Sequence, residues 1–234
     1  FSTYIPESEI SRLNQSGSLV FENPFFYPVL LACKKVHSAT KGAFDPTIGP
    51  LVNAYGFGPN KISKIFDRYY IDSLLQFVGF SKINFNSSFI TLPKGAYLDL
   101  SAVAKGYAVD VIADYLKSKN IKHAMIEIGG EVRTFGTNDQ GEVWKIGIQD
   151  PLIESEDYQP PFAAVSLENR SVATSGNYRN FYRLGNKIYT HIIDPRTGNI
   201  GKKNILSASV FATNCMLADA YATAFMVLDI ETSM

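Results

Sequence analysis

The segment that most constrains the fold is an almost wholly apolar stretch near the end of the 234-residue chain, "CMLADAYATAFMVL" at 215–228. Its length and composition predict a helix that is buried on nearly every side. Such a helix needs other elements packed around it, so the chain must build more than one layer of secondary structure.

Two side chains with oxygen atoms interrupt this apolar helix. Asp219 and Thr223 are four residues apart and therefore share one helix face. An unpaired carboxylate in apolar surroundings is unfavourable by several kcal/mol. In one interpretation, a nearby loop donates a hydrogen bond to Asp219, and Thr223 bonds back to its own helix. In the other, both side chains hold a hard cation such as Mg²⁺. The spacing alone favours the first interpretation, because such pairs are common.

The remaining pattern mixes helical and strand segments without regular alternation. It predicts an α+β fold with a mainly antiparallel sheet and flanking helices. No Pro/Gly/Ser-rich linker divides the chain, so we expect a single domain over 1–234. Further helices are predicted to begin within 5–14 and to cover 23–40, 72–80 and 101–120. Strands are predicted within 82–100, 122–149, 162–176, 181–193 and 207–213.

Charge and cysteine content narrow the possible functions. Lys plus Arg and Asp plus Glu both total 22, which gives no broad basic surface and argues against nucleic acid as a partner. No apolar run reaches 18 residues, so no membrane-spanning helix is expected. Cys33 and Cys215 lie among apolar residues and are interpreted as buried thiols, with a disulfide as the alternative that geometry must decide.

A second candidate site begins the helix in "LDLSAVAKGYAVD". Asp99 ends a strand, Ser101 can cap the helix, and Lys105 lies about one turn in. Free N–H groups at a helix start form an anion site, although Asp99 could be only a cap and Lys105 only a surface residue. Further along, this helix places one set of residues on a common face: Ala108, Val111, Ile112, Tyr115 and Leu116.

A third candidate is His191, which lies on an apolar strand that runs into "DPRTGN". It is either a core residue or the best general base in the chain. His37 and His123 lack comparable polar neighbours in the sequence. The Gly- and Pro-rich segment "GAFDPTIGPLVNAYGFG", which contains Phe44 and Asp45, is either a rigid loop or a wall for a planar ring.

Together and in order, seven blocks of the chain resemble the ApbE-like FAD:protein FMN transferases. They are "STYIPESEISRLN", "GAFDPTIGPLVNAYGFG", "LDLSAVAKGYAVD", "IEIGGEVRTFG", "ATSGNYRNFY", "THIIDPRTGN" and "ADAYATAFMVL". The resemblance implies a T-fold-like α+β architecture with FAD in a deep cleft. The family pattern begins upstream with a strand containing a Met-Gly-Thr motif, which we expect to lie outside this sequence.

The resemblance assigns roles residue by residue. It implies that Asp219 and Thr223 are Mg²⁺ ligands, that Ala102 supplies a backbone carbonyl to the same ion, and that His191 activates the acceptor hydroxyl. Six positions correspond to FAD contacts: Tyr4, Ala43, Phe44, Asp45, Asp99 and Lys105. With the resemblance, the metal interpretation of Asp219 and Thr223 becomes the favoured one.

The implied reaction cleaves FAD, releases AMP and attaches FMN to a Thr or Ser hydroxyl of an acceptor redox protein. The family also implies an exported protein on the periplasmic or cell-surface side of the inner membrane, with a lipid anchor outside this chain. Two alternatives remain: an FAD pyrophosphatase that gives FMN and AMP, and a flavin-binding protein without turnover. Tyr4 at the first flavin-contacting position favours transfer.

Overall fold

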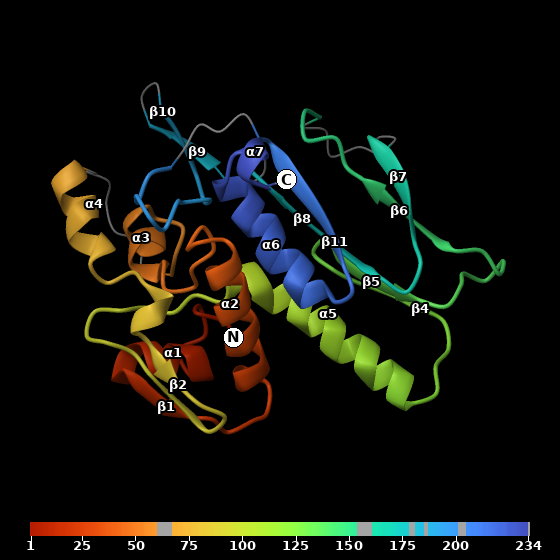
Figure 1. Ribbon diagram of the computed structural model, residues 1–234, viewed down its shortest axis with the longest axis horizontal. Coiled ribbons are helices and arrows are strands. Elements are labelled where there is room, and N and C mark those ends of the chain that lie inside the picture. The colour runs from red at the N-terminus through yellow and green to blue at the C-terminus, as the bar shows by residue number, and fades with distance from the viewer. Residues whose placement is uncertain (60–66, 154–160, 178–180, 185–186, 201–204, 234) are drawn as a thin grey trace.

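The computed structural model describes residues 1–59, 67–153, 161–177, 181–184, 187–200 and 205–233 (Figure 1). Its α-helices are α1 (Glu9–Ser16), α2 (Phe26–Ala39), α3 (Gly49–Ala54), α4 (Arg68–Leu75), α5 (Ser101–Ser118), α6 (Cys215–Val227) and α7 (Ile230–Ser233), with a 3₁₀ turn at Phe80–Lys82. Its strands are β1 (Ser18–Val20), β2 (Asn84–Phe85), β3 (Phe89–Thr91), β4 (Ala124–Ile128), β5 (Glu131–Phe135), β6 (Trp144–Ile148), β7 (Ala163–Leu167), β8 (Ser171–Gly176), β9 (Phe181–Leu184), β10 (Lys187–Thr190) and β11 (Ser207–Ala212).

The largest sheet of the described residues has four antiparallel strands in the order β11-β8-β5-β4. Helices α5 and α6 pack together on it (Figure 1). A three-stranded sheet, β1-β3-β2, lies beside α1, and two hairpins, β6-β7 and β9-β10, complete the strands. This arrangement confirms the predicted α+β class with antiparallel sheet and flanking helices.

Helix α6 is buried, as its composition predicts. It packs against α5, α2, β8 and β11, and its alanines at 218, 220, 222 and 224 have no exposed surface. The Asn214 side chain caps its start by accepting from the backbone N–H of Leu217. Leu13, Phe26, Leu30, Leu98 and Val103 extend the same core toward α1 and α2.

Several element boundaries differ from the predicted ones. Helix α2 begins at Phe26, three residues after the predicted start. The Asn23 side chain accepts a hydrogen bond from Phe25 N–H and so closes a turn that precedes the helix. Helix α4 begins at Arg68, four residues before the predicted start, because Asp67 caps it by accepting from Tyr70 N–H. Strand β1 has only three residues and shows no alternation of apolar and polar residues in the sequence. It forms by pairing with β3.

The apolar face that the spacing marks on α5 is not the buried face of this helix. Ile112 and Tyr115 are exposed, and the buried residues are Val103, Gly106, Val109, Asp110 and Ala113. The reason is the close approach of α6, which selects the face that carries the small Gly106 over the face with bulkier side chains.

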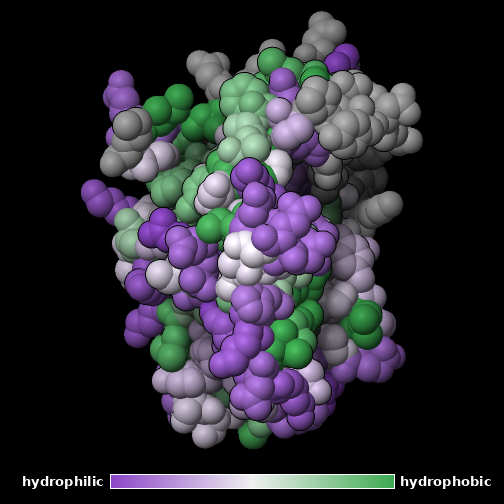
Figure 2. Space-filling view, turned by 90° about the vertical axis from the view of Figure 1, so that its right-hand side faces the viewer, coloured by the Kyte–Doolittle hydropathy of each residue, from purple (hydrophilic) through white to green (hydrophobic). Residues whose placement is uncertain are grey.

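The two cysteines, Cys33 and Cys215, are both free and buried, which confirms the thiol interpretation. Among the helices within the described ranges, none combines the length and the apolar character that crossing a membrane requires. At the end of the molecule to the right of Figure 1, hydrophilic residues form much of the surface, with hydrophobic ones scattered between them (Figure 2).

Candidate active site

One cavity of about 980 Å³ is bordered by every residue that the sequence singled out for a functional site. These residues are Tyr4, Ala43, Phe44, Asp45, Asp99, Ala102, Lys105, His191, Asp219 and Thr223. They come from the N-terminal segment, the loop before α3, the start of α5, the segment after β10 and the middle of α6. The volume is at the upper end of the range for small-molecule and cofactor sites.

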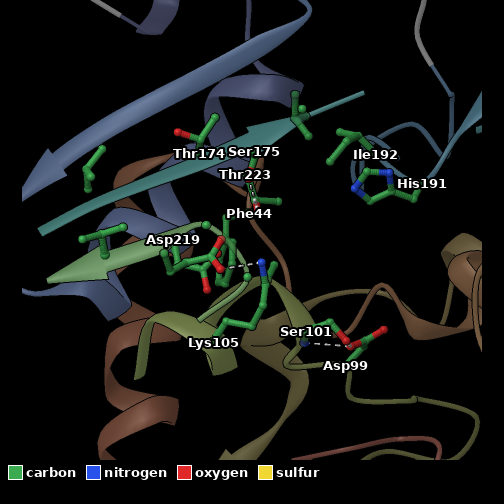
Figure 3. Close-up of a pocket in the computed structure, with 18 of the residues that line it drawn as sticks. Phe44, Asp99, Ser101, Lys105, Thr174, Ser175, His191, Ile192, Asp219 and Thr223 are labelled. Atoms are coloured by element: carbon green, nitrogen blue, oxygen red, sulfur yellow. Dashed lines mark hydrogen bonds and ion pairs between the residues drawn. The ribbon is translucent and has the colours of Figure 1, made fainter. Parts of the chain in front are cut away.

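A pair of buried carboxylates lies at one end of this cavity. Asp219 is 3% exposed and its Oδ2 accepts a hydrogen bond from Gly106 N–H at 3.0 Å. Glu131, the first residue of β5, is 1% exposed and pairs with Lys105 Nζ at 2.6 Å. Lys105 and Asp219 point into the same part of the cavity (Figure 3).

Burial perturbs both of these acids. Loss of solvation and, second, the charge of Glu131 raise the pKa of Asp219 to about 7, although the Gly106 hydrogen bond and Lys105 oppose the rise. Burial likewise raises the pKa of Glu131, against the pull of Lys105. The charges that act on the Asp219 carboxylate are thus the carboxylate of Glu131 and the ammonium of Lys105.

Hydroxyl groups continue the polar surface along α6. The hydroxyls of Thr223 and Ser175 are hydrogen-bonded at 3.2 Å, and Thr174 bonds Ser209 at 2.7 Å. Thr174 and Ser175 are residues of strand β8, which pairs with β11. The hydrogen-bond partners differ from the first interpretation of this pair. Asp219 accepts from Gly106 of helix α5 and not from a loop, and Thr223 bonds to Ser175 of β8 and not back to its own helix.

The start of α5 is held by Asp99 on the floor of the cavity. Its Oδ1 accepts from the N–H of Ser101 at 2.9 Å and from the Ser101 hydroxyl at 2.5 Å. Ser101 is thus the first helical residue, and the capping group is the Asp99 carboxylate, contrary to the prediction that Ser101 caps. Ala102 and Lys105 follow within the first turns and border the same cavity.

His191 lies just after β10 in a bend, one residue beyond the strand on which the sequence placed it. Its ring meets the ring of Phe57 edge to face, with centroids 6.3 Å apart. The Phe57 carbonyl in turn accepts from the Tyr4 hydroxyl at 2.9 Å. His191 and Asp219 lie on opposite sides of the view in Figure 3. The sequence also suggests a hairpin turn around Gly185 and Asn186, and these two residues lie outside the described part of the chain.

Asp45 borders the cavity, but its carboxylate is used within the loop. Oδ1 accepts from the N–H and hydroxyl of Thr47, and Oδ2 accepts from Phe80 N–H at 2.9 Å. His37 Nδ1 lies 3.4 Å from the same oxygen. His37 therefore has a polar neighbour, Asp45. The sequence did not reveal this contact, because only the tertiary fold brings the two side chains together.

His123 differs from its prediction in the same way. Its Nδ1 accepts from Thr137 N–H at 2.9 Å. Neither His37 nor His123 lines the main cavity. Among the described residues that line it, His191 is the only histidine.

Sequence reasoning missed Glu131. The only local signal was an acidic residue after a Gly pair and before an apolar strand, in "GGEVRTF". Its partner Lys105 is 26 positions earlier, so only the packing of α5 beside β5 reveals the ion pair.

This fold and site define an α+β protein with one large ligand cavity, in which buried acids, hydroxyls and a helix start are gathered. The ApbE family model matches residues 1–234, and the chain belongs to the ApbE family. The FAD:protein FMN transferase of Vibrio cholerae serotype O1 is 37% identical over 242 residues, covering 100% of this chain and 70% of the relative. The Escherichia coli K12 protein of the same description is 34% identical over 242 residues, covering 98% and 67%.

Solved structures agree with this assignment. The flavin transferase ApbE from Vibrio cholerae matches with a TM-score of 0.86 and 36% identity, over 100% of this chain and 74% of that one. The apo form of the Pseudomonas stutzeri flavinyl transferase ApbE matches with a TM-score of 0.87 and 27% identity, over 100% and 72%. The fold described above is therefore the ApbE flavin transferase fold.

Proposed function

We propose that this protein is a Mg²⁺-dependent FAD:protein FMN transferase, which attaches FMN from FAD to a Thr or Ser hydroxyl of an acceptor protein and releases AMP. The observation that carries the proposal is the single cavity that gathers a buried carboxylate, a hydroxyl pair, a helix start and a histidine. Its relatives at 34–37% identity have the same described activity.

The residues present fit a divalent cation. Asp219 is almost fully buried, and among the described residues its Oδ1 has no hydrogen-bond donor. Glu131 is a second acid close enough to raise the pKa of Asp219, and its own ion pair already uses Lys105. The Ala102 carbonyl oxygen has two lone pairs, of which the helical hydrogen bond uses one, so it can also act as a ligand. A carboxylate, a hydroxyl and a backbone carbonyl are the hard oxygen donors that Mg²⁺ prefers.

When bound, Mg²⁺ would neutralise charge on the pyrophosphate of FAD as the bond to AMP breaks. Asp219, Thr223 and the Ala102 carbonyl would hold it. The Lys105 ammonium, which borders the cavity, and the positive end of the α5 dipole favour a phosphate in the same place. The aromatic wall of Phe44 and Tyr4 suits a planar ring.

His191 acts on the acceptor. The acceptor hydroxyl oxygen attacks the FMN-side phosphorus, the anhydride P–O bond breaks, and AMP leaves with the bond's electron pair. The hydroxyl proton passes to His191, whose imidazole is suited to this role near neutral pH. The edge contact with Phe57 holds the ring at the cavity wall.

Intact mass measurement of an acceptor protein, incubated with this chain, FAD and Mg²⁺, tests the proposal. We expect the acceptor to gain the mass of FMN less one water, with AMP formed in equal amount. Omitting Mg²⁺ should abolish both products. Free FMN formed equally with and without acceptor would instead identify a pyrophosphatase, and unchanged FAD would identify a binding protein.

We further propose that the acceptor is a redox protein outside the cytoplasm and that the full protein is lipid-anchored there. The support for this location is the family resemblance. Fractionation of cells that express the full-length protein, followed by immunoblotting of the membrane and soluble fractions, tests it. Recovery in the cytoplasmic fraction alone would refute the location without affecting the reaction.

A further inference from the structure

Two groups on α5, one turn apart, hold the first turns of α6. Gly106 N–H donates to Oδ2 of Asp219 at 3.0 Å. Asp110, four residues later, accepts from the N–H groups of Cys215 at 2.9 Å and Met216 at 2.8 Å. Residues four apart share a helix face, so both contacts lie along the same α5–α6 seam.

Asp110 is itself braced from the sheet. It is 6% exposed, and Nη1 of Arg133 on β5 lies 2.7 Å from its Oδ1. The Asp110 carboxylate is therefore balanced by a guanidinium and by two N–H groups at the positive end of α6. Bonds to ionised groups are stronger and shorter than neutral ones. The chain of contacts from β5 through Asp110 to α6 is consequently stiff.

Gly106 fixes the distance between the two helices. A Cβ at this position would lie 2.4 Å from the Cys215 carbonyl oxygen and 2.8 Å from Cβ of Asp219. The helices thus touch backbone to backbone at the level of Asp219. With the separation set by Gly106, the position of α6 along the seam is set by Asp110, one turn away.

We propose that Asp110, braced by Arg133, is a positioning residue that fixes where Asp219 and Thr223 stand in the cavity. Asp110 does not border the cavity and acts through α6. Cys215 lies one turn before Asp219, so a slide or tilt of this first turn moves the Asp219 carboxylate with it. The inference rests on the proposed function, in which Asp219 and Thr223 hold a divalent cation.

The Asp110→Asn variant of the full chain tests this inference. It replaces one accepting oxygen by an NH₂ group that would face either an α6 N–H or the Arg133 guanidinium. The readout is Mn²⁺ binding in the presence of FAD, followed by the electron paramagnetic resonance of free Mn²⁺. We expect the affinity to fall by about 10-fold, the lower end of the loss typical for groups that orient a metal ligand. The FAD affinity without metal should stay at the wild-type value.

Asp114→Asn is the matched control. Asp114 lies 3.4 Å from the same arginine, is 69% exposed in its side chain, and makes no described contact with α6. This variant should bind Mn²⁺ and FAD like the wild type. If Asp110→Asn does not fold, Arg133→Lys keeps the charge but loses the planar fork, and it should weaken Mn²⁺ binding in the same direction.

Wild-type Mn²⁺ affinity in folded Asp110→Asn would overturn the inference. Equal losses of Mn²⁺ and FAD affinity would also overturn it, because they would indicate general loosening of the cavity. Asp219→Ala tests the proposed metal site separately. If that variant also retains Mn²⁺, the metal assignment itself fails, whereas loss in Asp219→Ala alone would refute only the role of Asp110.

Discussion

Replacing Gly106 by alanine should force α5 and α6 apart and remove most of the transfer activity. The added methyl carbon would lie 2.4 Å from the Cys215 carbonyl oxygen, and ordinary contact begins at 3.4 Å. The gap at this point must therefore open by 1.0 Å. Both the Cys215 carbonyl and the Asp219 Cβ belong to the helix framework, so no side-chain rotation can relieve the clash.

The stability cost follows from the same geometry. Overpacking a close contact costs about 1–3 kcal/mol, and the better helix propensity of alanine offsets about 1 kcal/mol. The net loss of about 0–2 kcal/mol lowers Tm by at most about 8 °C for a chain of this size. The activity loss should be larger, because a 1 Å displacement of a catalytic group can cost about 100-fold.

The assay is kcat/KM for FMN transfer at saturating Mg²⁺, together with thermal unfolding followed by circular dichroism. Ser118→Ala, near the exposed end of α5, serves as the control and should behave like the wild type. Gly106→Ser should be at least as impaired as the alanine variant. A Gly106→Ala protein with wild-type Tm and activity would show that this backbone contact does not set the position of Asp219.

Three further predictions follow from the site. Without metal, the stability of the wild type should fall relative to Asp219→Asn as pH rises from about 4 through 7. The folded-state pKa of Asp219 is about 7 and exceeds the ordinary value of 3.8, so the stability that its protonated form contributes is complete below about pH 4 and lost above about pH 7. Urea-unfolding midpoints that run parallel for the two proteins across this range would contradict the prediction. Lys105→Met should cost about 2–3 kcal/mol in urea unfolding by leaving the Glu131 carboxylate unpaired, and Lys105→Met/Glu131→Gln should recover most of it; a double variant no more stable than the single one would exclude the ion pair as the cause. His191→Ala should lower acceptor labelling by about 10²–10⁴-fold while FAD fluorescence titration shows unchanged binding; full labelling would remove His191 from the mechanism.

The helices that carry the site could be predicted because their signals are local. The apolar run at 215–228 made α6 a buried helix, and the four-residue spacing put Asp219 and Thr223 on one face. The sequence before α5 placed a helix start beside Asp99 and Lys105. Hydrophobic periodicity and end signals act over a few residues, so they are readable without the fold.

The partners of these residues could not be predicted, because they lie far away in the chain. Glu131 meets Lys105, and Asp45 meets His37, only where separate elements pack. The buried face of α5 could not be read from the apolar spacing for a related reason. Ile112 and Tyr115 have the spacing of a core face but are exposed. The buried face is the one with Gly106, because only a small residue allows α6 to approach so closely.

The sequence by itself determined that Asp219 would be a carboxylate in an apolar helix, and hence that something had to compensate its charge. Only the tertiary structure decided what surrounds it: Gly106 N–H on one oxygen, Glu131 and Lys105 nearby, and Asp110 holding the helix one turn earlier. The physical reason is that burial depends on composition over a short stretch, whereas electrostatic balance depends on which distant groups the packed helices and sheet bring within a few ångströms.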